Sequence, residues 1–462
     1  REIACSPSVL IVAYPVRGLD INSSYRIYDL LNEQKKKGVA VIFIGEDLDV
    51  LMELSDRLMV LCGGKVSGIV DPKTVTKEEI GLMMIHVDHK PEDQGAAAGN
   101  EKGKGKEPLI RMAKRDTLSN QKAWCIRGVA LLLSLITGGL VILALGHNPF
   151  SVYTSMVVGA WGSSTVIRET IKIAVPLLIT AIGISFAFKM KFWNIGGEGQ
   201  IIVGAVAAGY FGLFTAHILP KVPLVILMML AGILAGGLYG LLPAVCKAKW
   251  GTNETLFTLM LNYIALAFVK YLMNGPWKAP GSSFPKIAML APGARLTKVL
   301  GVHWGWILAL VIVVISSIYL SKTKQGYEIA VVGESNNTAR YAGINVSKVF
   351  IRTMFISGAL CGLVGMLQFA GADYTITEGI AGGVGFTAIT VAWLAKMNPY
   401  GMLVVSVFIA MLERGANTIQ TQFKIPASAA DLLIGIILFF MLGCEFFISY
   451  RLILRGKEEE DV

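Results

Sequence analysis

The sequence is short of the side chains that carry most enzyme chemistry. Five histidines occur in 462 residues, and the six cysteines are scattered, with no C-x-x-C pair and no His-paired spacing. Neither a metal site nor a disulfide framework is indicated. Charged residues make up only 16% of the chain and apolar residues 54%. This composition is too apolar for an ordinary soluble protein. The sequence also shows no cluster of histidines or paired carboxylates of the kind that a membrane enzyme needs.

The apolar residues gather in long blocks. Ranges 125–146, 170–188, 222–245 and 428–450 are nearly uncharged, and about 20 such positions let a helix cross a bilayer core of about 30 Å. The net charge of +10 lies mainly at the ends of such blocks, as cytoplasmic basic residues do. No basic face with interleaved aromatic residues accompanies it. The lipid bilayer, and not nucleic acid, is therefore the predicted partner.

The chain has three regions that differ in composition and in the pattern of apolar residues. Residues 1–88 alternate short apolar runs with polar helical segments, which predicts soluble α/β structure. Residues 89–123 are rich in Gly, Ala and Lys without an apolar period, which predicts a flexible linker. Residues 124–462 form the membrane domain. The predicted fold is thus an all-α polytopic membrane protein of about ten transmembrane helices, preceded by a partial α/β domain.

The predicted spans follow from hydropathy and from the positions of basic turns. Ten crossings bring the chain back to its starting side, and the basic turns place both termini in the cytoplasm. The loop 274–303 carries four basic residues but is predicted outside, because reversing it would reverse stronger signals around it. The spans run approximately over 125–146, 168–189, 194–215, 222–246, 253–273, 304–321, 350–371, 382–396, 401–419 and 428–450.

A glycine-rich motif at 193–204 opens the third span. Asn194, Glu198 and Gln200 lie at the mouth of this apolar segment. Ionisable groups at membrane depth usually face a protein interior or a water-filled path, so these side chains are candidates for a translocation path. An alternative remains open: Glu198 can simply mark a cytoplasmic helix start, near the positive end of the helix dipole. Asn262, deep in another span, is a further candidate for the path or for an interhelical hydrogen bond.

A second motif repeats this pattern. Gly382-Gly-Val-Gly385 lines up with Gly196-Gly-Glu-Gly199, and each opens an apolar span. The predicted topology starts the two spans from opposite faces, as an inverted repeat does, and glycine-interrupted spans in corresponding positions mark a solute path at the repeat interface. Thr387 and Thr390 would be the polar lining of the second copy.

The longest polar interruption on the predicted inner side is 324–344. Ser335 or Asn336 can cap a short helix that ends at Gly343. Such a helix on the membrane face suits docking of a cytoplasmic subunit, although an ordinary loop also explains the segment. The candidate coupling residues are Tyr327, Glu328, Glu334, Arg340 and Gly343.

The order of short motifs in 1–88 is informative. Pro15-Val-Arg-Gly-Leu-Asp20 follows an apolar strand, Val41-Ile-Phe-Ile-Gly-Glu-Asp-Leu48 comes next, and Gly63-Gly-Lys65 follows a third strand. This order resembles the part of an ABC ATPase that runs from the Walker B strand through the D-loop and switch region to a C-terminal hairpin. The resemblance implies a C-terminal ATPase fragment.

The same resemblance implies that the fragment is inactive. It puts Ala13 and Tyr14 where acidic residues hold Mg²⁺ and polarise water, and Glu46 at the switch histidine position. No G-x-x-x-x-G-K-[ST] loop occurs in the chain to cradle a triphosphate. We therefore expect a degenerate remnant, in which Asp20 matches the D-loop aspartate and could still contact a partner site.

The membrane domain also resembles a known family. The segments are Asn194–Gln200, Thr258–Tyr263, Ala330–Glu334, Ala339–Asn345 and Gly385–Ile389. Together they resemble the permeases of ribose, simple-sugar and nucleoside ABC importers, the nucleoside branch most closely, over about 118–450.

The resemblance implies a transport subunit without catalysis of its own. It would sit in the plasma membrane, pair with a second permease subunit, dock on ABC ATPase subunits through 326–345 and receive solute from an external lipoprotein. ATP and Mg²⁺ would be bound by the ATPase subunits, and this chain would bind no cofactor. The alternative is a secondary transporter or channel, which would need no cytoplasmic docking segment.

Overall fold

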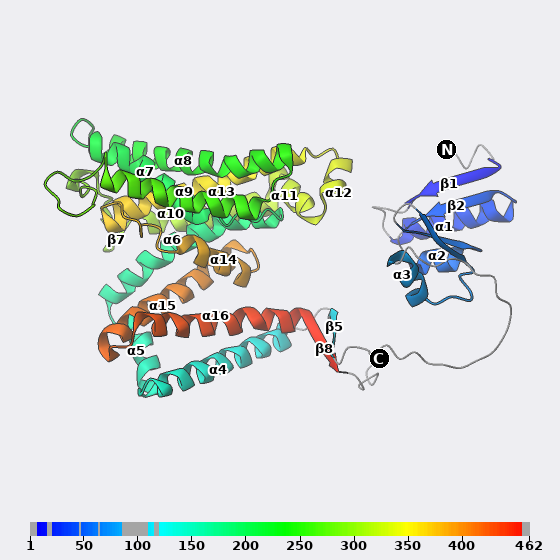
Figure 1. Cartoon of the computed structure of the whole chain (residues 1–462), viewed down its shortest axis with the longest axis horizontal. Helices are drawn as coiled ribbons and strands as arrows, with labels where there is room; N and C mark the ends of the chain where they lie inside the picture. Colours follow the sequence, from blue (N-terminus) through cyan, green and yellow to red (C-terminus); the bar gives the residue numbers. More distant parts are fainter. Residues whose placement is uncertain are drawn as a thin grey trace. The chain divides into compact units, whose positions relative to one another are not determined.

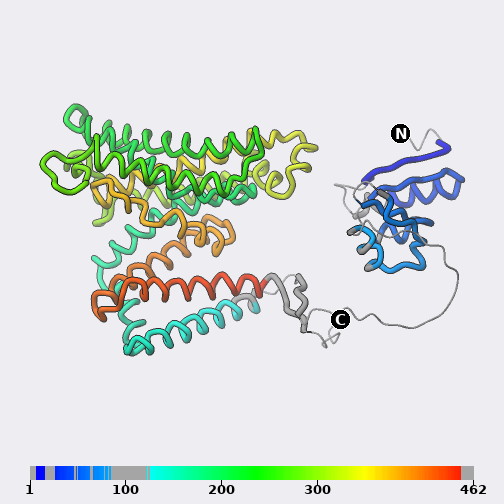
Figure 2. Tube along the Cα trace, in the orientation of Figure 1, coloured from blue at the N-terminus to red at the C-terminus, as the bar shows by residue number. Residues whose placement is uncertain are grey.

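The computed structural model describes residues 7–15, 21–45, 48–62, 65–85, 110–114 and 120–454. The chain divides into two compact units, Arg1–Gly105 and Lys106–Val462 (Figures 1 and 2).

The first unit is a small α/β structure. Strands β1 and β2 pair in parallel, with Val9 opposite Ala40, and helix α1 connects them. Thr76 and Glu79 form a capping box at the start of the last helix of this unit: the Thr76 amide donates to Glu79 Oε2 at 3.0 Å, and the Glu79 amide donates to Thr76 Oγ1 at 3.4 Å. The elements are β1 (Val9–Ala13), α1 (Ile21–Lys36), β2 (Ala40–Ile44), α2 (Leu48–Leu54), an antiparallel pair β3 (Leu58–Cys62) and β4 (Lys65–Val70), and α3 (Lys77–Ile85).

The second unit is helical. Nine of its helices, among the described residues, are long and apolar enough to cross a membrane. They are α4 (Asn120–Ala144), α6 (Ser164–Lys189), α7 (Gly197–Phe214), α8 (Lys221–Trp250), α9 (Glu254–Asn274), α10 (Gly305–Lys322), α13 (Val346–Gln368, continued by a π-helical turn Phe369–Asp373), α15 (Pro399–Phe423) and α16 (Ala427–Ser449). The shorter elements are α5 (Pro149–Trp161), α11 (Lys324–Glu334), α12 (Asn336–Tyr341), α14 (Val384–Leu394), β6 (Lys298–Val299) with β7 (Val302–His303), and β5 (Ile110–Lys114) with β8 (Tyr450–Leu454).

One predicted span is corrected by the structure. The apolar segment 382–396 contains only the 11-residue α14, about 16 Å long at 1.5 Å per residue and about half of a bilayer core. The backbone explains the difference: Gly382 and Gly383 have φ of +58° and +78°, and Lys396 has φ of +51°, so none of them continues the helix. Hydropathy counts apolar residues but does not detect left-handed backbone. Helix α5, capped by Asn148, was not among the predicted elements.

Ion pairs bring three helix ends to one side of this unit. Glu445, near the end of α16, pairs with Arg127 near the start of α4 at 2.7 Å and with Lys396, just after α14, at 2.8 Å. Figure 1 shows α4 and α16 running side by side. The membrane region therefore begins and ends on one side, as an even number of crossings requires.

Helix α13 ends on the opposite side. His303 lies against Gly371 at the end of α13 and near Lys172 in the first part of α6. Beyond the other end of α6, the ring of Trp193 stacks on that of Trp393 in the last turn of α14, with centroids 5.8 Å apart. The chain thus crosses between 374 and 394 by an irregular loop followed by the short α14.

Close helix packing forms the centre of this unit. Helices α7, α8 and α13 meet at glycines: a Cβ on Gly204 would lie 2.4 Å from Gly362 Cα, and one on Gly236 would lie 2.4 Å from the Gly358 carbonyl oxygen. Small residues at four-residue spacing let membrane helices approach this closely. The spacing Gly232–Gly236–Gly240 on α8 is visible in the sequence. The irregular segments pack against this close-packed centre.

Candidate functional site

The connection from α6 to α7 is non-helical at 192–196. Asn194 is fully buried there, and its side chain stabilises the segment by hydrogen bonds. Its Oδ1 accepts from the Gly196 amide at 3.1 Å. Its Nδ2 donates to Ser357 Oγ on α13 at 3.1 Å and to Gln200 Oε1 at 3.3 Å. Buried backbone outside a helix needs such partners. Asn194 and Gln200, both predicted for the path, therefore lie inside the protein and hold the segment in place.

Helix α9 supports the same segment from another side. Asn262 Oδ1 accepts from the Gly199 amide at 2.8 Å, and its Nδ2 donates to the Ile195 carbonyl at 2.9 Å. One turn earlier, Thr258 Oγ1 accepts from the Ile195 amide at 3.2 Å. Asn262 thus makes the interhelical hydrogen bonds that were one of its two predicted roles.

Glu198 joins the two glycine motifs. Its Oε1 accepts from the Gly383 amide at 2.8 Å, and its Oε2 accepts from the Gly385 amide at 2.8 Å. These amides are at the N-terminal end of α14, where a carboxylate satisfies free N–H groups and the helix dipole. A Cβ on Gly385 would lie 2.3 Å from the Glu198 backbone nitrogen, so this contact requires glycine. The sequence aligned the two motifs, and the structure brings them into direct contact.

A pocket of about 420 Å³ opens beside this contact. Its walls come from α7, from one face of α9, and from the irregular loop with the first turn of α14. The aromatic side chains of Tyr263 and Phe386 are 62% and 45% exposed. The lining residues are Glu198, Ile202, Leu259, Asn262, Tyr263, Leu266, Glu378, Gly379, Gly382, Gly383 and Phe386.

The pocket contains some of the predicted residues and not others. Glu198 and Asn262 line it, while Asn194, Gln200, Thr387 and Thr390 are not in its wall. Thr387 Oγ1 donates to the Gly383 carbonyl at 3.3 Å, within α14. On α9 only Asn262 was predicted from the sequence, and Leu259, Tyr263 and Leu266 were not. The spacing i, i+3, i+4, i+7 nevertheless places all four positions on one side of a helix.

The pocket wall carries negative charge. Besides Glu198 it includes Glu378, which forms an exposed ion pair with Lys270 at 3.1 Å. No lysine or arginine is among the described residues that line it. The polar atoms of Glu198 and Asn262 are already engaged with backbone groups. What remains is a mostly apolar groove with two aromatic faces and no cation for an anionic group.

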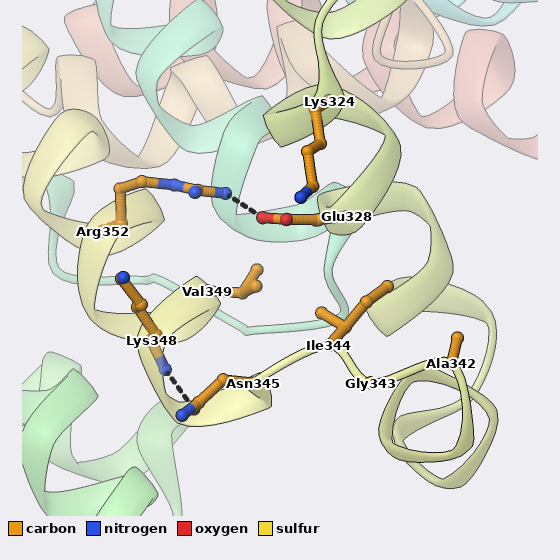
Figure 3. A pocket seen from close by; sticks show the side chains of 9 residues that line it. All are labelled: Lys324, Glu328, Ala342, Gly343, Ile344, Asn345, Lys348, Val349 and Arg352. Carbon is orange, nitrogen blue, oxygen red and sulfur yellow. Dashed lines mark hydrogen bonds and ion pairs between the residues drawn. The ribbon is translucent and has the colours of Figure 1, made fainter.

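The predicted coupling segment forms α11 and α12, beside the start of α13. Ser335 caps α12 by accepting from the Thr338 amide at 3.3 Å, and Gly343 follows the helix with φ of +75°. The candidates Tyr327, Glu334, Arg340 and Gly343 are exposed. Glu328 instead turns inward and pairs with Arg352 at 3.0 Å (Figure 3). The remaining two candidates, Asp20 and Glu46, lie outside the described residues.

The fold and this groove define a multi-pass membrane permease. Residues 166–442 match the family described as the permease component of the branched-chain amino acid transport system. This match covers more than half of the chain, so the protein belongs to this family of ABC transporter permeases.

Individual relatives have sugar and nucleoside names. The chain is 30% identical to the glucose ABC transporter permease protein TsgB13 of Haloferax volcanii over 345 residues, 71% of this chain and 90% of that protein. It is 31% identical to the guanosine ABC transporter permease protein NupP of Bacillus subtilis over 319 residues, 68% of this chain and 91% of that protein. An 85-residue match, 41% identical, covers 18% of this chain and 17% of the nucleoside import ATP-binding protein NupA of Lactococcus lactis.

Proposed function

We propose that this chain is the permease subunit of an ATP-driven importer in the plasma membrane, and that it translocates a nucleoside or a simple sugar. The observation that carries the proposal is the contact of Glu198 with Gly383 and Gly385 beside the pocket. Membrane transporters place solute sites where interrupted helices meet, because the irregular backbone there must be buried or line a cavity.

The chemistry of the groove favours an uncharged solute. Two carboxylates in its wall and the absence of a lining cation among the described residues disfavour an anion such as a nucleotide or a sugar phosphate. The faces of Tyr263 and Phe386 suit a nucleobase or the apolar face of a sugar ring. An amino acid would need a positive partner for its carboxylate, and the described lining residues include no lysine or arginine. The relatives named for glucose and guanosine also favour an uncharged sugar or nucleoside.

Three surfaces support the proposed partners. The groove is open on the side of Tyr263 and Phe386, and a second permease subunit would close it. ATPase subunits, which bind ATP and Mg²⁺, would dock on α11 and α12, while this chain binds no cofactor. The opposite side carries the loop 274–303, whose exposed Lys278, Lys286 and Lys298 suit an acidic external lipoprotein.

For residues 1–88 the proposal is a degenerate C-terminal fragment of an ABC ATPase. The parallel pair β1–β2, the β3–β4 hairpin and the NupA match support this origin. Ala13 ends β1, and the next residue is Tyr14, so neither position offers a carboxylate to Mg²⁺. Saturable binding of Mg²⁺-ATP to the purified full-length chain without partner ATPases would contradict this part of the proposal.

Two tyrosines on α9 provide a matched test of the groove. Tyr263 lines it and Tyr271 does not, yet they are 62% and 63% exposed. With ATPase and lipoprotein partners co-expressed in a host that lacks its own importers, we measure uptake of labelled guanosine, uridine, ribose and glucose. Tyr263→Ala should reduce uptake of the transported solute about tenfold, as loss of one aromatic contact of about 1.4 kcal/mol would, and Tyr271→Ala should leave it unchanged. Equal effects of the two substitutions would exclude the groove as the solute path.

The alternative of a secondary transporter or channel is not favoured, since the family and the named relatives are ABC permeases. It makes a different prediction. Uptake that continues at full rate with a catalytically inactive partner ATPase, or after deletion of 335–343, would support the alternative.

A further inference from the structure

A second pocket, of about 290 Å³, lies within the coupling segment, beside the end of α12. It is formed where α11, the turn after α12 and the first two turns of α13 meet (Figure 3). Its lining residues are Lys324, Glu328, Ala342, Gly343, Ile344, Asn345, Lys348, Val349 and Arg352.

The pocket has an excess of positive charge. Lys324, Lys348 and Arg352 line it together with a single carboxylate, Glu328, which Arg352 already binds at 3.0 Å. Within the part of the chain that the structure describes, neither lysine forms an ion pair. Figure 3 shows the ammonium end of Lys348 pointing toward Arg352, and Lys324 pointing toward Glu328. Two positive charges therefore remain without a counter-ion in one depression.

The guanidinium has an unused donor as well. Arg352 Nε is buried and has no hydrogen-bond partner among the described residues. A buried N–H without a partner is costly, and a charged one more so. Converging cations with a free donor are the arrangement that binds a phosphate or carboxylate group.

The position of this pocket near the ends of the membrane helices α10 and α13 indicates the source of the anion. Helix α10 ends at Lys322, and the span that starts with α13 covers 28 residues, Val346–Asp373. Such a helix is about 42 Å long, about 12 Å longer than the hydrocarbon core. The first turns of α13, with Lys348 and Arg352, therefore extend into the layer of lipid headgroups.

We propose that this pocket binds a phosphate-bearing anion, supplied by the headgroup of an anionic phospholipid in the leaflet that faces α11 and α12. Basic pockets between membrane helices on the cytoplasmic side are suited to such headgroups, and that leaflet is rich in anionic lipid. The bound phosphate would tie the turn at 342–345 to the start of α13. The proposal concerns attachment to lipid and does not depend on which solute is transported.

The test uses the full-length protein and two double variants of equal charge. Lys324→Gln with Lys348→Gln removes two cations from the pocket. Lys249→Gln with Lys322→Gln removes two exposed cations from the ends of α8 and α10, which lie outside it. Retention of phosphatidylglycerol is measured by native mass spectrometry, with phosphatidylcholine as the neutral lipid. Thermal unfolding in detergent is measured with added phosphatidylglycerol, phosphatidylcholine or inorganic phosphate.

We expect phosphatidylglycerol, and not phosphatidylcholine, to be retained and to stabilise the wild type. The pocket variant should bind it about 25-fold more weakly, because each of the two lysines near an anionic headgroup contributes about a factor of five. The control variant should behave like the wild type, and Lys324→Arg with Lys348→Arg should retain the lipid. Stabilisation by inorganic phosphate that the pocket variant loses would support the phosphate site and assign it to a free anion.

Two outcomes would overturn the proposal. The first is equal retention of phosphatidylglycerol by the pocket and control variants, with no response to inorganic phosphate in either. The second is a pocket variant with wild-type lipid and phosphate binding but weakened association with the ATPase subunit, since that result would assign the pocket to an acidic side chain of the ATPase.

Discussion

Replacing Glu198 with glutamine changes one charge at the point where the two glycine motifs meet. The carboxylate accepts from the amides of Gly383 and Gly385, each at 2.8 Å. A carboxamide has one oxygen, so it can keep one of these bonds, while its NH₂ group faces the other amide. The substitution loses a hydrogen bond to a charged group and leaves an N–H without a partner, a combined cost of about 2–4 kcal/mol.

The assay is thermal unfolding of the purified full-length chain, combined with solute uptake. Glu378→Gln is the control: Glu378 lines the same pocket but is paired with Lys270 in an exposed ion pair, which contributes at most about 1 kcal/mol. We expect Glu198→Gln to lower the unfolding temperature by several degrees and to reduce uptake, and Glu378→Gln to leave the unfolding temperature nearly unchanged. A Glu198→Gln protein with wild-type stability and uptake would refute the reasoning that this carboxylate holds α14 in place.

Two further predictions test other parts of the fold. Gly362→Ala puts a Cβ 2.1 Å from the Gly232 carbonyl oxygen and should destabilise the chain by about 1–3 kcal/mol or more. The control is Gly435→Ala on α16, whose Cβ meets nothing within 4 Å and which should be neutral in the same unfolding assay. Equal unfolding temperatures for the two variants would disprove the tight packing of α8 on α13. Burial, with a smaller effect from Lys172, lowers the pKa of His303 to about 4. Because the unfolded chain then binds more protons below pH 6.5, stability should fall by about 2 kcal/mol between pH 7 and pH 5. His303→Gln should remove that part of the pH dependence, and an unchanged pH profile would show that His303 does not titrate in this way.

Membrane insertion was predictable because hydropathy is a local property of the sequence. Nine of the ten predicted spans correspond to long helices, with ends shifted by a few residues. The exception is 382–396, where the left-handed Gly382 and Gly383 delay the helix. A sequence average cannot detect such backbone geometry, and the start of this helix contacts a residue far away in the chain: the Gly383 amide donates to Glu198, 185 positions earlier.

For the candidate site, the sequence predicted several of the residues but not the roles that they have. Asn194, Glu198 and Asn262 were identifiable because polar side chains in apolar spans are costly and usually face a protein interior or a water-filled path. Their roles were not identifiable, because a buried amide can brace backbone or line a path, and only its partners distinguish the two. Ser357 and Ile195, the partners of Asn194 and Asn262, belong to other segments of the chain. Thr387 and Thr390 were predicted from the repeat alone, and the pocket wall does not include them.

The sequence alone determined that this chain is a polytopic membrane protein with two similar glycine motifs, because apolar length, basic turns and glycine spacing are all encoded within short stretches. The permease assignment came from the resemblance of its motifs to a known family. Only the tertiary structure decided that Glu198 closes one motif onto the other, that the tyrosine face of α9 completes the groove, and that three basic side chains converge near α11. These features arise from contacts between segments far apart in the chain, and their geometry is set by the close packing of α7, α8 and α13.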